Sequence, residues 1–159
     1  MMNAIEKFNI TATDMNADGT EAVFVVEPLV RGYGNTLGNP LRRILLSTLP
    51  GYAATSIKID GVLHEISACN GVKEDVPEIV LNVKGIVAKL EGDCPKTVVI
   101  DVTGPCEVTA GSITPDAEVK ILNPSHHICT VSENARFYME ITFDEGRGYV
   151  SSDANKQIY

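Results

Sequence analysis

The strongest hydrophobic pattern in the chain predicts a helix that packs on two sides. At about 100° per residue, the apolar side chains between residues 37 and 49 recur on one arc. The members of that arc are Leu37, Leu41, Ile44, Leu45 and Leu49. Arg42 and Leu46 lie on roughly the opposite side. Because a helix on its own sheet needs only one apolar arc, Leu46 beside Arg42 indicates a second contact surface, on another part of the chain or on another protein.

A proline sets the expected start of this helix. Asn39 is a suitable N-cap and Pro40 a suitable first helical residue, whereas a proline in mid-helix would lose its bond to Thr36. We therefore expect regular helix from Pro40 to Thr48. The looser turn before it holds three glycines, Gly32, Gly34 and Gly38.

Alternating patterns predict that most of the remaining chain is β-strand. The expected strands are Phe8–Asp14, Thr20–Glu27, Thr55–Asp60, Val62–Ser67, Ile86–Glu91, Thr97–Thr103, Glu118–Leu122, Ile128–Ser132 and Arg136–Asp144. A second, short helix begins after Asp75, a plausible N-cap, and ends at Lys84 before Gly85. The polar tail Ser151–Tyr159 is expected to be disordered.

These elements predict an α+β fold with two parts of different composition. Residues 1–52 hold a hairpin and the long apolar helix, and residues 53–159 hold mostly strands around one short helix. A chain of 159 residues has room for one ordinary domain or two small ones.

Charge and hydropathy exclude several classes of protein. The net charge of −8 argues against direct contact with nucleic acid by phosphate neutralisation. No apolar run approaches the roughly 20 residues that a membrane-spanning helix needs, and no signal peptide is visible. The four cysteines are irregularly spaced and form no CxxC pair, which is typical of reduced thiols in a cytoplasmic protein.

Candidate catalytic and metal-binding residues have simpler explanations. His126 and His127 precede Cys129, but adjacent strand residues point to opposite faces, so the two rings are not expected to share an ion. Glu74 and Asp75 at the start of the short helix are explained by capping and by the helix dipole. The sequence therefore predicts no metal and no cofactor, and it favours a non-catalytic protein.

The glycine-rich stretch Gly32–Gly38 leaves an alternative open. Glycine-rich loops that enter a helix bind phosphates through backbone amides. However, a P-loop continues with Gly-Lys-Ser/Thr, and here Gly38 is followed by Asn39-Pro40. A small enzyme or module that binds a phosphorylated ligand at this loop is thus the second hypothesis, and a free-standing β-rich interaction module is the third.

The stretch from Arg31 to Ser47, RGYGNTLGNPLRRILLS, resembles the signature helix of the alpha subunit of bacterial DNA-directed RNA polymerase. Five further blocks are similar to the same family in the same order. They are Glu27–Leu29, Ile59–Glu65, Gly71–Asp75, Leu81–Gly85 and Gly146–Val150. The resemblance extends from about Phe8 to Val150.

This resemblance implies a fold and a role. Residues 1–52 would be the N-terminal half of a dimerisation subdomain and residues 53–159 an inserted β-rich subdomain. The returning half and the DNA-contacting domain would lie beyond Tyr159, so we expect a truncated subunit or a split fragment. In the family, the subunit is a non-catalytic part of a nucleotidyltransferase: it forms a homodimer and scaffolds the beta and beta-prime subunits in transcription.

The resemblance also implies roles for particular residues. Arg43 and Leu46 match family contact points for the large catalytic subunits, and Lys84 matches a further one. Arg42 is assigned to the same subunit interface. The apolar arc would serve folding and dimerisation, through Leu37, Leu41, Ile44 and Leu45.

Overall fold

The computed structural model describes residues 7–17, 19–114 and 116–156. The chain divides between Thr48 and Leu49 into an N-terminal and a C-terminal compact unit. The sequence placed its boundary after Tyr52, but the first strand of the C-terminal unit already begins at Pro50. The roles expected for the two parts stay a prediction.

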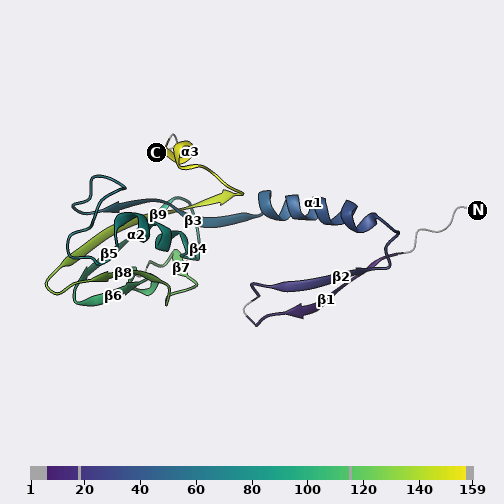
Figure 1. Ribbon diagram of the computed structural model, residues 1–159, viewed down its shortest axis with the longest axis horizontal. Coiled ribbons are helices and arrows are strands. Elements are labelled where there is room, and N and C mark those ends of the chain that lie inside the picture. The colour runs from purple at the N-terminus through teal and green to yellow at the C-terminus, as the bar shows by residue number, and fades with distance from the viewer. Residues whose placement is uncertain (1–6, 18, 115, 157–159) are drawn as a thin grey trace, which may run out of the picture. The chain divides into compact units, whose positions relative to one another are not determined.

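The N-terminal unit opens with an antiparallel hairpin of β1 (Asn9–Met15) and β2 (Ala22–Glu27), shown in Figure 1. The Asn16 side chain organises the turn, because its Oδ1 accepts hydrogen bonds from the amides of Thr20 and Glu21 at 2.9 and 3.1 Å. Both strands were predicted, and the structure confirms the hairpin.

The long helix α1 (Tyr33–Ser47) begins earlier than predicted. The expected start at Pro40 is wrong, since Pro40 lies inside the helix and Gly32, with φ of 87°, occupies the N-cap position. None of the described α1 residues is buried, so the Thr36 carbonyl that Pro40 leaves without an amide partner can bind water. The proline therefore does not force the helix to start at its own position.

The C-terminal unit is built on one antiparallel sheet with the strand order β3-β9-β5 (Figure 1). Its strands are β3 (Pro50–Ile59), β9 (Arg136–Arg147) and β5 (Lys96–Thr103). Every second residue of β9 from Phe137 to Phe143 is buried, and these residues meet the buried side chains of β5. The buried set on the two strands is Phe137, Met139, Ile141, Phe143, Val98 and Ile100. The strands predicted at Thr97–Thr103 and Arg136–Asp144 lie within β5 and β9.

Two short antiparallel pairs complete the C-terminal unit. One pair joins β4 (Ala88–Leu90) to β7 (Val119–Ile121), and the other joins β6 (Cys106–Thr109) to β8 (His127–Val131). A 3-10 helix, η1 (Ala110–Ser112), follows β6. Neither β6 nor η1 was predicted.

Two sequence-based expectations in this unit are wrong. The segment predicted as a strand at Val62–Ser67 is an irregular loop in which Leu63 and Ile66 are 90% and 85% exposed. No strand pairs with it among the described residues. The tail expected to be disordered instead forms α3 (Ser152–Lys156), where Ser151 accepts a hydrogen bond from the Asn155 amide at 3.0 Å; residues 157–159 lie outside the described residues.

The short helix α2 (Val76–Lys84) is confirmed with its predicted caps. The Asp75 side chain accepts a hydrogen bond from the Glu78 amide at 2.9 Å, and Gly85 follows the last turn. Val76, Ile79 and Val83 are buried, so one face of α2 contributes to the core. Among the described residues, every fully buried apolar side chain belongs to the C-terminal unit, and the fold as a whole is α+β.

Candidate protein-interaction surfaces

The apolar side chains of α1 lie at the surface of the N-terminal unit. Leu41, Ile44 and Leu45 are exposed and Leu37 is half-buried. Leu46, on the other side of the helix, is 67% exposed. Soluble proteins rarely expose several neighbouring large apolar side chains on one element unless that surface binds something. We call these five residues and the two arginines between them the α1 surface.

The two arginines of the α1 surface are available for contacts. Arg42 and Arg43 are exposed, and within the described residues neither guanidinium has an ion-pair partner. A cavity of about 380 Å³ lies beside Arg43 and is lined by Asn39, Pro40, Ile44 and Ser47. A planar guanidinium next to apolar surface is the arrangement in which arginine pairs with a carboxylate of another protein.

Lys84 lies at the C-terminal end of α2, where its charge suits the helix dipole. The end of α2 is held by two hydrogen bonds, one to β8 and one to His126, the residue before β8. The Asn82 side-chain amide donates to the Ile128 carbonyl at 2.9 Å, and the His126 ring contacts the Asn82 carbonyl at 2.7 Å. Lys84 is therefore an exposed cation on a firmly anchored helix, in the C-terminal unit, whereas the other predicted contact residues belong to the N-terminal unit.

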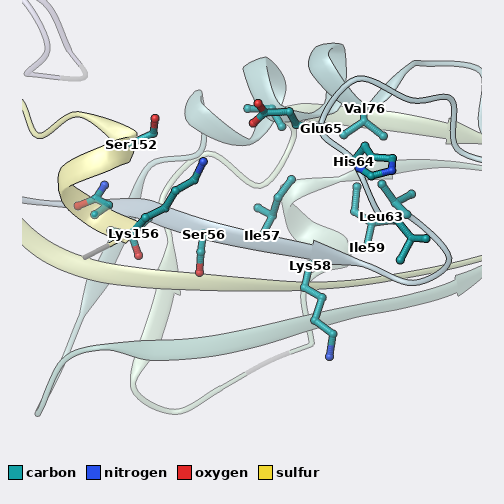
Figure 2. A pocket seen from close by; sticks show the side chains of 14 residues that line it. Ser56, Ile57, Lys58, Ile59, Leu63, His64, Glu65, Val76, Ser152 and Lys156 are labelled. Atoms are coloured by element: carbon teal, nitrogen blue, oxygen red, sulfur yellow. The ribbon is translucent and has the colours of Figure 1, made fainter. Parts of the chain in front are cut away.

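A groove that no predicted site residue lines runs along the edge strand β3. It has a volume of about 540 Å³, and Figure 2 shows the side chains around it. Five consecutive β3 residues, 55–59, form one wall, and Val76 and Val80 of α2 form another. The loop residues 62–65 and three residues of α3 complete it. No local pattern predicts this groove, because it depends on the packing of segments that are far apart in the sequence.

A buried carboxylate joins α2 to β8, and sequence reasoning missed it. Glu74 is 8% exposed and does not act as the helix cap. Its Oε2 accepts a hydrogen bond from the Thr130 amide at 2.6 Å, and its Oε1 accepts one from the Thr130 hydroxyl at 3.0 Å. The same Oε1 lies 3.1 Å from Nε2 of His127.

His127 lies between two carboxylates. Its Nε2 faces Glu74 and its Nδ1 lies 2.9 Å from Oε1 of Glu107 on β6. Burial lowers the pKa of the His127 ring, but the hydrogen bonds to Glu74 and Glu107 and the charges of both outweigh it, so the pKa lies above its ordinary value. Burial likewise raises the pKa of the Glu74 carboxyl, but the hydrogen bonds that it accepts outweigh burial and hold the pKa below its ordinary value.

The remaining candidate ligands are placed as packing residues. His126 contacts Asn82 while His127 contacts Glu74 and Glu107, so the two rings point to different partners, as predicted. Cys129 is fully buried, and burial is the largest cause that raises the pKa of its thiol to about 12. In the part of the chain that the structure describes, no three His, Cys, Asp or Glu side chains are arranged to hold a metal ion.

The glycine-rich stretch does not form the loop on which a phosphate site would depend. Gly34 and Gly38 lie within α1, and only Gly32 has the left-handed backbone conformation. The alternative of a phosphate-binding loop at Gly32–Gly38 therefore loses its structural basis. In the described residues, no helix has both the length and the hydropathy to cross a membrane.

The fold and the exposed surfaces define the class of protein. It is an α+β protein in which one helix exposes apolar and cationic side chains and a second helix is anchored to the sheet strands beside it. The chain belongs to the family described as the RNA polymerase Rpb3/RpoA insert domain, whose model matches residues 57–158. That range covers the unit from within β3 to the end of α3.

The curated relatives that the chain matches are also named as RNA polymerase subunits. The chain is 57% identical over 155 residues to a protein of Clostridium kluyveri named DNA-directed RNA polymerase subunit alpha, covering 98% of this chain and 49% of that protein. Proteins of the same name from Clostridium beijerinckii and from Clostridium botulinum strain Eklund 17B are 54% and 53% identical over 155 residues, with the same coverage. The chain thus spans about half the length of the curated relatives that it matches.

Proposed function

We propose that the chain is a non-catalytic assembly subunit of a bacterial DNA-directed RNA polymerase and acts in transcription. The observation that carries this proposal is the α1 surface, which presents apolar side chains and two arginines without an ion-pair partner among the described residues, on a helix with no buried residue. The match of residues 57–158 to the insert domain and the names of the relatives point to the same role.

The α1 surface has two sides, and each suits a different partner. Leu37, Leu41, Ile44 and Leu45 form the arc that would bind a second copy of the subunit. Burying each large aliphatic side chain contributes about 1.5–3 kcal/mol, so this arc can supply most of a dimer contact. The opposite side carries Arg42 and Leu46, with Arg43 on the flank, and would bind a large catalytic subunit.

Lys84 would provide a second contact with the large subunits. Its helix is capped at both ends and anchored to β8, so the ammonium group is presented from a fixed base. A positioned cation of this kind recognises a carboxylate at the edge of an interface. The beta and beta-prime subunits would supply the catalytic residues and the metal ions.

Reconstitution tests this proposal. The tagged chain is mixed with purified beta and beta-prime subunits, and the retained complex is measured for the wild type, Arg43→Ala and Leu46→Ala. Loss of one partner of a buried charge pair costs about 2–5 kcal/mol, so Arg43→Ala should weaken retention at least tenfold. Arg147→Ala, at the exposed end of β9, is the matched control.

Two results would contradict the proposal. One is that the wild-type chain retains neither large subunit at micromolar concentration. The other is that Arg43→Ala and Arg147→Ala bind equally well. Circular dichroism of each variant shows whether the helix content is preserved, so that lost binding is not mistaken for lost structure.

A further inference from the structure

Glu74 is the one polar or charged residue that is buried among the described residues. Burying a carboxylate is costly unless it is hydrogen-bonded or paired with a cation. Asp75, the next residue, already caps α2. The position of Glu74 therefore has to be explained by what it contacts on β8.

The segment before α2 runs beside β8 and is attached to it by backbone bonds. The Lys73 amide donates to the Thr130 carbonyl at 3.0 Å, and the Ser132 amide donates to the Gly71 carbonyl at 2.8 Å. The Glu74 carboxylate extends this attachment, because it accepts from both the amide and the hydroxyl of Thr130. These bonds hold the start of α2 in place on β8.

His127 is the only cation-forming side chain that pairs with Glu74 in the described residues. The groups that face this pair are Glu107 of β6, Thr130 of β8 and the thiol of Cys129, which stays neutral. Cys69, a second buried thiol, lies in the segment before α2. No other charged side chain of these elements makes an ion pair with Glu74 or His127.

Both ring nitrogens of His127 face a carboxylate oxygen. A neutral imidazole donates from one nitrogen only, whereas the imidazolium donates from both. Carboxylates accept but do not donate when ionised, so the two contacts at 3.1 and 2.9 Å are both hydrogen bonds only when His127 is protonated. The geometry is thus that of the charged ring.

We propose that Glu74 and His127 form a proton-linked clasp that fixes the start of α2 on β8, and that Glu74 is a positioning residue for the Lys84 contact. The clasp is defined by Glu74, His127 and Glu107. It rests on the proposed function for the role of Lys84, but its chemistry involves this chain alone. When His127 loses its proton, one of its two carboxylate contacts becomes a repulsion between lone pairs, and the clasp weakens.

The clasp acts in the range near neutral pH. Histidine titrates between about pH 5 and 8 after small shifts, and the two carboxylates favour the charged form of His127. As the pH rises through the pKa of His127, the N-terminal end of α2 loosens while the contact of Asn82 with β8 remains. The helix that carries Lys84 therefore becomes less rigidly held.

An NMR titration of the imidazole resonances tests the clasp in the whole chain. We expect His127 to titrate above the ordinary value of about 6.5, and Glu74→Gln and Glu107→Gln each to lower its pKa. Glu78→Gln is the matched control, because the exposed Glu78 side chain makes no hydrogen bond within the described residues. A His127 that titrates at the ordinary value, unmoved by Glu74→Gln, would overturn the proposal.

Hydrogen exchange supplies a second readout. The protection of the α2 amides, corrected for intrinsic rates, should fall severalfold as the pH rises through the measured pKa of His127. His127→Gln keeps a donor toward Glu74 but cannot titrate in this range, so it should remove that pH dependence. Protection in the wild type that does not change across the titration would overturn the clasp, even where Glu74→Gln fails to fold.

Measuring the binding of a large subunit at several pH values distinguishes a failure of this inference from a failure of the proposed function. If the wild-type chain binds a large subunit, the affinity should fall with rising pH through the pKa of His127, and less so in His127→Gln. A pH dependence that is identical in the two proteins would refute the role of Glu74 in positioning Lys84. If no large subunit binds, the proposed function fails, and the titration and exchange experiments still decide the clasp.

Discussion

The side chain of Asn82 donates a hydrogen bond to the Ile128 carbonyl at 2.9 Å, and the backbone carbonyl of Asn82 accepts one from the ring of His126 at 2.7 Å. One residue near the end of α2 thus joins the helix to β8 and to the residue that precedes β8. Together with the Glu74 contacts at the other end, α2 is attached to the same strand twice.

Asn82→Ala should destabilise the C-terminal unit by about 1–3 kcal/mol, because a carbonyl of the buried residue Ile128 loses its side-chain donor. Urea unfolding followed by circular dichroism measures the change. Leu81→Ala, at a position 68% exposed on the same helix, should change the stability by less than about 0.5 kcal/mol. Equal effects of the two substitutions would contradict a structural role for the amide.

Gly71→Ala should be more harmful than Gly61→Ala. Both glycines have positive φ, 77° and 74°, so each substitution carries a backbone penalty of about 1–2 kcal/mol. Only at Gly71 does an added Cβ meet another atom, the Ala135 Cβ, at 2.4 Å, whereas nothing lies within 4 Å at Gly61. The extra loss at Gly71 should be about 1–3 kcal/mol. Matching unfolding midpoints for the two variants would rule out the close approach.

The amides of α1 should exchange much faster than those of β5. The described residues of α1 include no buried side chain, and an isolated helix of this length is marginal in water. In β5, by contrast, Ile100 is fully buried in the sheet core. Hydrogen exchange in a dilute monomeric sample measures both regions, and protection of Leu41–Leu49 as strong as that of Thr97–Thr103 would refute the expectation.

The free energy of unfolding of the C-terminal unit should fall at both acid and alkaline pH, because Glu74 loses its charge in acid and His127 loses its charge in alkali. The pKa of Glu74 is lowered, so its contribution is present above about 4.5, its unfolded value, and is lost as the pH falls through the lower folded pKa. The pKa of His127 is raised, so its contribution is present below about 6.5 and is lost as the pH rises through the higher folded pKa. Urea unfolding from pH 3 to 9 measures both limbs.

Glu74→Gln provides the comparison for this pH profile. It removes the titrating carboxylate, so the acid limb should flatten and the alkaline limb should become shallower. Glu78→Gln is the control, because the exposed Glu78 side chain makes no hydrogen bond within the described residues. A Glu74→Gln profile that runs parallel to the wild type over both limbs would show that other groups cause the pH dependence.

Elements whose signals are local could be predicted from the sequence alone. The caps of α2 were predicted because Asp75 bonds the amide of Glu78, three residues away. The strand β9 was predicted over Arg136–Asp144 from its own run of strand-forming residues, which is a local signal. The hairpin of β1 and β2 was predicted for the same reason, with its turn residues between the strands. Such signals are read within a few residues of each other.

Long-range packing settled which distant segments each element contacts. Val62–Ser67, predicted as a strand, has no neighbouring strand among the described residues, and β6 is too short to be recognised without its pairing to β8. Pro40 suggested a helix start, yet α1 extends before it because exposure lets water satisfy the freed carbonyl.

Glu74 is the clearest case of this kind. The sequence placed it at a helix start, where a carboxylate suits the dipole, and that explanation was sufficient locally. Its partners, His127 and Thr130, are 53 and 56 residues away along the chain. A hydrogen bond across such a separation depends on how the segment before α2 packs against β8, and no local pattern of residues encodes that packing.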